Sequence, residues 1–202
     1  MELIVITADT FLKEEAKAIN RLFKEGLKTL HIRKPHCKVE ELSLLLEQIE
    51  EEHLNRIVLH DHFQLVNQYN LKGYHINQRN QNLLEKSTEK TTSRSCHGFE
   101  EIAENDFYDY LFLSPIFNSL SKPGYGKAFT EEELLRARKA KRIHEKVYAL
   151  GGITPSMCPL IKQYGFGGVA VLGYLWEKYK KDQELRQLIL RFQELQRIID
   201  TL

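Results

Sequence analysis

The chain has 202 residues, of which 42% are hydrophobic and 28% charged, and its formal net charge is +1 at pH 7. This composition indicates a folded protein with a substantial core, and the balanced charge argues against a general attraction to nucleic acid or to an anionic membrane. No apolar run approaches the roughly 20 residues that a membrane-spanning helix needs. The beginning, MELIVITADT, lacks the basic region of a signal peptide, and three cysteines without a CxxC pair favour a reduced, cytoplasmic compartment.

Short apolar runs alternate with longer amphipathic segments along the whole chain. Strands are predicted at 2–7, 27–33, 56–60, 73–77, 92–97, 108–116, 146–152 and 167–173. Helices are predicted between them at about 11–26, 38–51, 63–69, 98–105, 130–145 and 154–165, and one final helix carries an apolar stripe from Leu185 to Leu202. Thr130 with Glu133 forms a capping box, and Thr154 before Pro155 marks another helix start.

This alternation of strands and helices predicts one α/β domain over residues 1–202, a (β/α)8 TIM barrel. The strands read as continuous apolar runs, as in parallel sheets that are buried on both faces. The competing architecture is an open, doubly wound sheet, in which phosphate-binding glycines usually follow the first strand. Here ITADTF, after the first strand, has no glycine, and the glycines follow strands seven and eight instead, which favours the barrel.

The active sites of such barrels lie at the C-terminal ends of the strands. Those ends hold imidazoles, hydroxyls, cations and one acid: His31, Arg33, His60, Asp61, His75, Asn80, Ser95, His97, Ser114 and, in the loop 117–129, Lys122. Such a set suits an anion that carries Mg2+. After strands seven and eight, glycines and helix N-termini favour a bound phosphate; the alternative is that Gly151 and Gly152 only make a tight turn.

The sequence resembles the thiamine phosphate synthase family, which includes the TenI-like proteins. The resemblance lies in the order and spacing of LIVITAD, LHIRKP, VLHDHFQLVNQYNLKGYHINQRN, SCHGFEEI, YDYLFLSPIFNSLSK, YALGGITPSM and GFGGVAVLGYLWE. It implies a (β/α)8 barrel and a Mg2+-using transferase of thiamine biosynthesis. That enzyme would join hydroxymethylpyrimidine diphosphate to thiazole phosphate and release diphosphate. The expected partners are small phosphorylated molecules, neither nucleic acid nor a membrane, and a homo-oligomer is left open.

The resemblance implies roles for individual residues. Arg33, Ser95 and Lys122 match diphosphate-contacting residues and are the expected catalytic groups, and Asp61 matches a Mg2+ ligand. Gly152 and the backbone of Leu172 and Gly173, next to Gly151, match the thiazole phosphate site. Four positions depart from the family pattern: His31 stands for a glutamine, Pro35 for a lysine that Lys34 would replace, His60 for an asparagine, and Asn80 for a second metal-binding aspartate. The asparagine retains an oxygen ligand without its charge, so weaker Mg2+ binding is expected.

Several alternatives stay open. A TenI-like thiazole tautomerase would carry a histidine in strand six, near the position where this chain has Ser114. A non-catalytic or regulatory paralogue that binds a thiamine-type phosphate would account for Pro35 and Asn80. Histidines at the ends of four neighbouring strands also raise a zinc site, although hydrogen bonding to a ligand is favoured. His62 is expected to face solvent or cap a helix, and the loop 117–129 to close over bound diphosphate.

Overall fold

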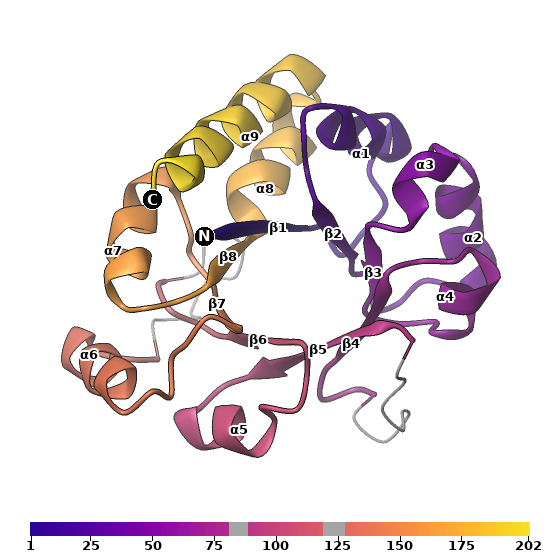
Figure 1. The fold of residues 1–202 in the computed structure, drawn as a ribbon. Helices are drawn as coiled ribbons and strands as arrows, with labels where there is room; N and C mark the ends of the chain where they lie inside the picture. Colours follow the sequence, from indigo (N-terminus) through magenta and orange to yellow (C-terminus); the bar gives the residue numbers. More distant parts are fainter. Residues whose placement is uncertain (81–88, 119–127) are drawn as a thin grey trace.

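The computed structural model describes residues 1–80, 89–118 and 128–202. Eight parallel strands form a closed barrel in sequence order, with β8 paired to β1 (Figure 1). The strands are β1 (Glu2–Ile6), β2 (Thr29–Ile32), β3 (Ile57–Leu59), β4 (Gly73–Ile76), β5 (Thr91–Cys96), β6 (Tyr110–Leu113), β7 (Val147–Leu150) and β8 (Gly168–Val171). The predicted (β/α)8 barrel is confirmed.

Helices surround the barrel as an outer ring (Figure 1). They are α1 (Glu15–Lys24), α2 (Val39–Glu47), α3 (Glu51–Leu54), α4 (Gln64–Gln68), α5 (Phe99–Glu104), α6 (Glu131–Lys139), α7 (Cys158–Gln163), α8 (Gly173–Asp182) and α9 (Leu185–Asp200). A 3-10 turn, η1 (Pro155–Met157), precedes α7. The capping box of α6 is confirmed, because Thr130 Oγ1 accepts from the Glu133 backbone N–H at 3.2 Å and Glu133 Oε2 accepts from the Thr130 N–H at 2.7 Å.

The C-terminal segment differs from the prediction of one final helix. It forms two helices, α8 and α9, which pack against each other and are separated at Gln183. Gln183 has a left-handed backbone with φ of 51°, a conformation that ends a helix. The apolar stripe therefore belongs to α9, whose Leu188, Phe192 and Leu195 are fully buried.

The interior of the barrel is divided into two halves of different chemistry. An apolar half is contributed by β1, β6, β7 and β8 and consists of Ile4, Ile6, Tyr110, Phe112, Tyr148 and Ala170. A polar half is contributed by β2, β3, β4 and β5 and consists of the buried side chains His31, His60, His75 and Ser93. Barrel interiors are usually filled by layers of bulky apolar residues, so the polar half calls for a separate explanation.

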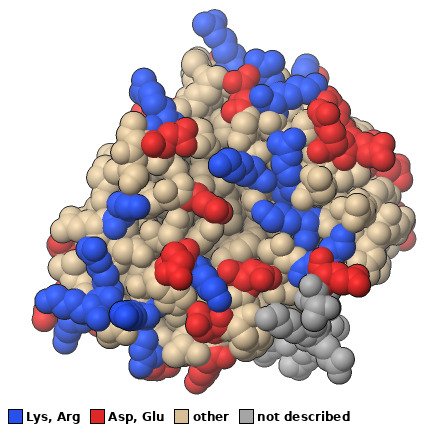
Figure 2. Space-filling model, viewed as in Figure 1, with Lys and Arg blue, Asp and Glu red and all other residues tan. Residues whose placement is uncertain are grey.

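The surface carries both signs of charge. Acidic and basic side chains alternate over the face seen in Figure 2, in keeping with the net charge of +1. No helix among the described residues is both long and apolar enough to cross a bilayer. The three cysteines, Cys37, Cys96 and Cys158, are free thiols, as expected.

Candidate active site

A pocket of about 330 Å³ opens at the C-terminal ends of the strands. One side of it is formed by side chains that follow β2 to β5, among them Arg33, His60, Arg79, Ser95 and His97. The opposite side is formed by the backbone after β7 and β8, at Gly151, Gly152, Leu172 and Gly173. The structure thus brings seven of the predicted site residues to one cavity: Arg33, His60, Ser95, Gly151, Gly152, Leu172 and Gly173.

The glycine side of the pocket depends on close backbone contacts. Gly151 and Gly152 have φ of 101° and 65°, and a Cβ on Gly152 would lie 2.3 Å from the carbonyl oxygen of Asn118. Glycine is the residue that tolerates both the left-handed backbone and this approach. On the same side of the cavity, Gly173 begins the ten-residue helix α8, whose first N–H groups lack intrahelical partners. Backbone N–H groups and a helix N-terminus make this side suitable for a phosphate.

The polar half of the barrel interior is a hydrogen-bonded imidazole network beneath the other side of the pocket. His31 Nε2 lies 2.6 Å from the Tyr110 hydroxyl, and His31 Nδ1 lies 2.9 Å from His60 Nε2. His75 contacts the hydroxyls of Ser93 and Ser95, each at 2.8 Å. His31 is fully buried and does not line the pocket, which does not favour the expected contact with substrate; its ring contacts His60, which does line the pocket.

Burial sets the charge of these imidazoles. Desolvation, reinforced by the neighbouring imidazoles, lowers the pKa of His31 and of His60 well below the ordinary value. Desolvation, with the positive charges of Arg79 and Arg33, lowers the pKa of His75 to about 3. All three rings are therefore neutral near pH 7, and they add hydrogen-bonding capacity to the site without adding positive charge.

The same geometry bears on the zinc hypothesis. The candidate ligand nitrogens of His31, His60 and His75 lie within 4.8 Å of one another, close enough to consider a metal. However, the His60 and His75 rings are stacked, with centroids 4.1 Å apart and planes inclined by 26°, so their in-plane lone pairs do not converge. His97 lies apart and donates from Nδ1 to the Ser114 carbonyl oxygen at 3.0 Å. The arrangement favours hydrogen bonding over a zinc site.

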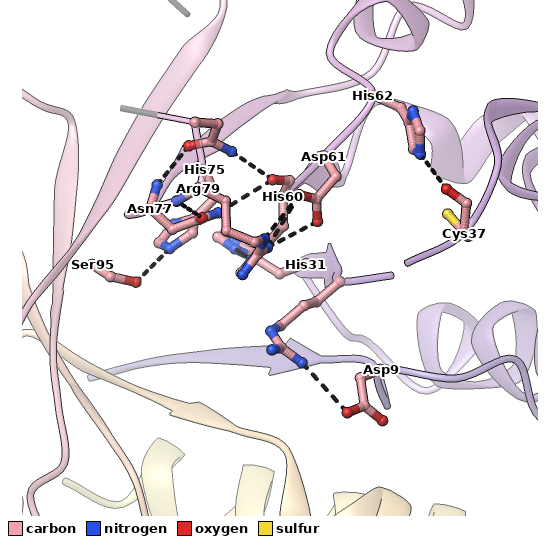
Figure 3. Close-up of polar contacts among 12 residues, drawn as sticks. Asp9, His31, Cys37, His60, Asp61, His62, His75, Asn77, Arg79 and Ser95 are labelled. Atoms are coloured by element: carbon pink, nitrogen blue, oxygen red, sulfur yellow. Dashed lines mark hydrogen bonds and ion pairs between the residues drawn. The ribbon is translucent and has the colours of Figure 1, made fainter. Parts of the chain in front are cut away.

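Two arginines and two aspartates occupy the mouth of the pocket above the imidazoles. Arg79 binds Asp61 through the Nε–Nη2 edge of its guanidinium: Nη2 lies 3.1 Å from Oδ1 and 3.0 Å from Oδ2, and Nε lies 3.3 Å from Oδ1 (Figure 3). Arg33 Nη1 lies 3.9 Å from Asp9 Oδ2, too far for a hydrogen bond. Burial, followed by the charge of Arg79, lowers the pKa of Arg33, and both arginines line the same pocket.

Asn80 holds the turn that carries Arg79. Its Nδ2 donates to the His60 carbonyl oxygen at 2.7 Å, and its Oδ1 accepts from the Asn77 backbone N–H at 2.8 Å. Asn77 Oδ1 in turn accepts from the Arg79 backbone N–H at 3.0 Å. Asn80 is buried and does not line the pocket. These contacts give the asparagine a structural role, and they do not favour the expected role as a metal ligand.

Lys34 has a different environment from the one expected. Its ammonium group is 1% exposed and donates to both oxygens of Glu15, at 2.7 and 2.9 Å. It also donates to the carbonyl oxygens of Ala8 and Thr10, at 2.9 and 2.7 Å. Lys34 is not part of the pocket wall, which does not favour the expected contact with substrate. It instead ties the end of β2 to α1 and to the segment after β1.

Two other expectations concern individual residues. His62 has a left-handed backbone with φ of 55° and donates from Nε2 to the Cys37 carbonyl oxygen at 2.8 Å, so its side chain is held against the segment before α2. Lys122, together with most of the proposed closing loop, lies outside the described residues. Sequence reasoning missed Arg79 and Tyr110. Arg79 directly precedes Asn80 at the end of the fourth strand, so inspecting each neighbour of that position would have found it.

Comparisons with known proteins identify the family of the chain. A model of the family described as thiamine monophosphate synthase matches residues 3–175. The thiamine-phosphate synthase of Flavobacterium johnsoniae is 24% identical over 198 residues, which cover 91% of this chain and 92% of the relative. A putative thiamine-phosphate synthase 2 of Aquifex aeolicus is 24% identical over 173 residues, which cover 77% of this chain and 88% of the relative.

Solved structures show the same relationship. A crystal structure described as thiamine phosphate pyrophosphorylase from Bacteroides thetaiotaomicron is 43% identical, with a TM-score of 0.88 over 99% of this chain and 98% of that chain. A thiamine phosphate pyrophosphorylase from Pyrococcus furiosus is 16% identical, with a TM-score of 0.77 over 99% of this chain and 96% of that chain, which shows the fold alone. The chain belongs to the thiamine monophosphate synthase family of transferases.

Proposed function

We propose that this protein joins hydroxymethylpyrimidine diphosphate to thiazole phosphate and releases diphosphate. One observation carries the proposal: a single cavity has an arginine side and a glycine side facing each other across the barrel mouth. Each side suits one phosphorylated group, by guanidinium charge on one side and by backbone N–H groups on the other. The transferase would thereby hold both of its substrates at once, with their reacting atoms between the two anion sites.

The reaction depends on stabilising the negative charge of the departing diphosphate more than on a strong base. The bond between the pyrimidine methylene carbon and the diphosphate oxygen breaks, and its electron pair leaves with the diphosphate. The thiazole nitrogen then supplies the pair that forms the new carbon–nitrogen bond. Arg33 and the Ser95 hydroxyl would bind the departing oxygens, and the neutral His60 would offer a hydrogen bond at the pocket wall. The neutral imidazole network suits a site in which no side chain must abstract a proton.

Members of the family generally use Mg2+, and Asp61 is the residue that would hold it here. Mg2+ prefers several oxygen ligands in near-octahedral geometry. Within the described part of the chain, both oxygens of Asp61 are bound by Arg79 and the amide of Asn80 is bound at both ends, so neither expected ligand has an oxygen without a protein partner. The residues of this mouth therefore do not fit the ion, and no step of the reaction above is assigned to it.

A second candidate is a relative that binds phosphorylated thiamine precursors without joining them. The ion pair between Arg79 and Asp61 favours it, because the carboxylate expected to recruit a metal is already neutralised. A tautomerase is less favoured, because Ser114 stands at the end of β6 where its histidine is expected.

Product formation separates these candidates. The purified protein is incubated with both substrates, and thiamine phosphate is measured by mass spectrometry. The synthase proposal expects product, and it expects Arg33→Gln to slow the reaction by about 100-fold, since a charge-assisted contact to the leaving group is lost. The matched control is Arg136→Gln, whose side chain is 68% exposed on α6. Retention of both ligands without any product would support the binding relative and reject the synthase.

A further inference from the structure

Asp61, the expected Mg2+ ligand, already forms an ion pair. Its carboxylate is paired with Arg79 through both oxygens, and only 18% of its side chain is exposed. Bidentate pairs between a guanidinium and a carboxylate are among the stronger charge-assisted contacts in proteins. A divalent ion at Asp61 would have to compete with the guanidinium of Arg79 for the same carboxylate.

Arg79 is held in place by a turn that side-chain amides stabilise. The sequence Asn77-Gln78-Arg79-Asn80 forms a turn in which the Asn80 N–H donates to the Asn77 carbonyl oxygen at 3.1 Å. The side chains of both asparagines bind backbone groups, and Asn80 and Asn77 also both donate to the His60 carbonyl oxygen. Asparagine favours such turns because its amide replaces a backbone partner. The turn therefore anchors Arg79 to the end of β3, directly beside Asp61.

The guanidinium groups of Arg79 and Arg33 have N–H donors that could bind an anion. Arg79 uses Nε and Nη2 on Asp61, and within the described part of the chain its Nη1 has no hydrogen-bond partner. Among the described residues, the contact of the Arg33 guanidinium with an acid is the long 3.9 Å one to Asp9. Two positive groups held side by side repel each other, and a polyanion placed between them relieves that repulsion. Guanidinium groups match phosphate oxygens in geometry, so both arginines offer donors of the right kind.

We propose that this mouth binds diphosphate without a divalent cation, and that Arg79 occupies the place of the metal by bridging Asp61 and the anion. The inference rests on the proposed function for the identity of the anion. Asp61 then orients Arg79 and is not a metal ligand, and Asn80 positions the turn. Arg79 supplies one positive charge through several directional donors, where an ion would supply two charges through oxygen ligands.

The test is calorimetric titration of inorganic diphosphate into the full chain, once in EDTA and once in excess MgCl2. Binding in EDTA at least as tight as in MgCl2 is expected, since Mg2+ also sequesters free diphosphate. Arg79→Gln should weaken binding in EDTA by about 10- to 100-fold, the loss expected for hydrogen bonds to a charged group. Arg136→Gln should match the wild type. Binding that requires Mg2+, no binding in either buffer, or an unchanged Arg79→Gln affinity would each overturn the inference.

A second readout uses the metal alone. Mn2+ replaces Mg2+ and is detected by electron paramagnetic resonance. The wild type should leave Mn2+ free, whereas Arg79→Gln releases the Asp61 carboxylate and should bind Mn2+ measurably. Equal Mn2+ binding by the two proteins would contradict the bridging role. Thermal melting of each variant shows that it is folded. Metal-free diphosphate binding without thiamine phosphate formation would reject the synthase function and leave this inference intact.

Discussion

The two halves of the barrel interior differ in chemistry although they share one fold. The half from β6 to β8 and β1 is filled with apolar and aromatic side chains, as barrels usually are. The half from β2 to β5 holds three buried imidazoles and a serine. The polar half lies directly beneath the arginine side of the pocket, since His60 and Ser95 belong both to its network and to the pocket wall.

This difference separates stability from recognition. The apolar half contributes burial that is indifferent to pH, because none of its groups changes charge near neutrality. The polar half contains hydrogen-bond donors and acceptors instead of apolar side chains, and it lies beneath the proposed diphosphate site. Its imidazoles stay neutral, so within the described residues the positive charge that lines the pocket comes from Arg33 and Arg79. Each of the following predictions concerns a substitution in or beside one of the two halves.

The largest effect is expected in the apolar half. Phe112 is fully buried between Tyr110 and the imidazoles, and Phe112→Ala should lower the free energy of unfolding by about 3–5 kcal/mol, through lost burial and a cavity. Urea unfolding at two pH values measures it. The loss should be the same at pH 7 and pH 6; a loss below about 1 kcal/mol would show that the interior is not tightly packed at this residue.

A comparable loss is expected beside the polar half, at the buried pair of Lys34 and Glu15. Glu15→Ala leaves a buried ammonium without its partner and should cost about 3 kcal/mol of unfolding free energy. The control is Glu132→Ala, at an ion pair whose carboxylate side chain is 80% exposed, where the cost should stay within about 0.5 kcal/mol. Replacing both buried partners, Glu15→Leu with Lys34→Met, should recover most of the loss; no recovery would refute the explanation by unpaired charge.

The pH dependence should come from the imidazoles. Their pKa values are lower in the folded chain than in the unfolded one, so below about pH 6.5 the unfolded chain binds more protons and stability falls as pH falls. Each group contributes up to about 1.4 kcal/mol per pH unit, and for His75 the loss continues toward its folded pKa of about 3. His75→Gln should flatten the slope of stability against pH relative to the wild type. Equal slopes would refute the assignment.

The smallest effect is expected at the boundary between network and pocket. Ser95→Ala removes the hydroxyl that contacts His75 Nε2 at 2.8 Å and should lower the unfolding free energy by about 1 kcal/mol. It should also weaken diphosphate binding, because the same hydroxyl faces the pocket. A stability change without any change in diphosphate affinity would confine Ser95 to a structural role.

The fold and the location of the site could be predicted, because both follow from the periodicity of apolar residues and from the order of strands, helices and glycines along the chain. Apolar strand runs, glycines after strands seven and eight, and polar strand ends indicate the barrel and its mouth without any knowledge of side-chain contacts. The break between α8 and α9 escaped this reasoning because Gln183 is not a residue type that signals a left-handed backbone.

The contacts of Lys34 and Asp61 could not be predicted, because their partners come from other elements of the fold. Lys34 is bound by Glu15, an acid on the buried face of α1, and strand-end position cannot reveal that pairing. Asp61 meets Arg79 across two loops, and the turn that places Arg79 is held by amide contacts to backbone groups. Ion pairs of this kind are set by tertiary geometry, which periodicity does not contain.

The most direct test of the account is a crystal structure of the protein soaked with inorganic diphosphate in EDTA. The account predicts that diphosphate binds between Arg33, Arg79 and Ser95, above His60, with the pair of Arg79 and Asp61 retained. Diphosphate found only at the glycine side, or Arg79 turned away from both Asp61 and the anion, would contradict it.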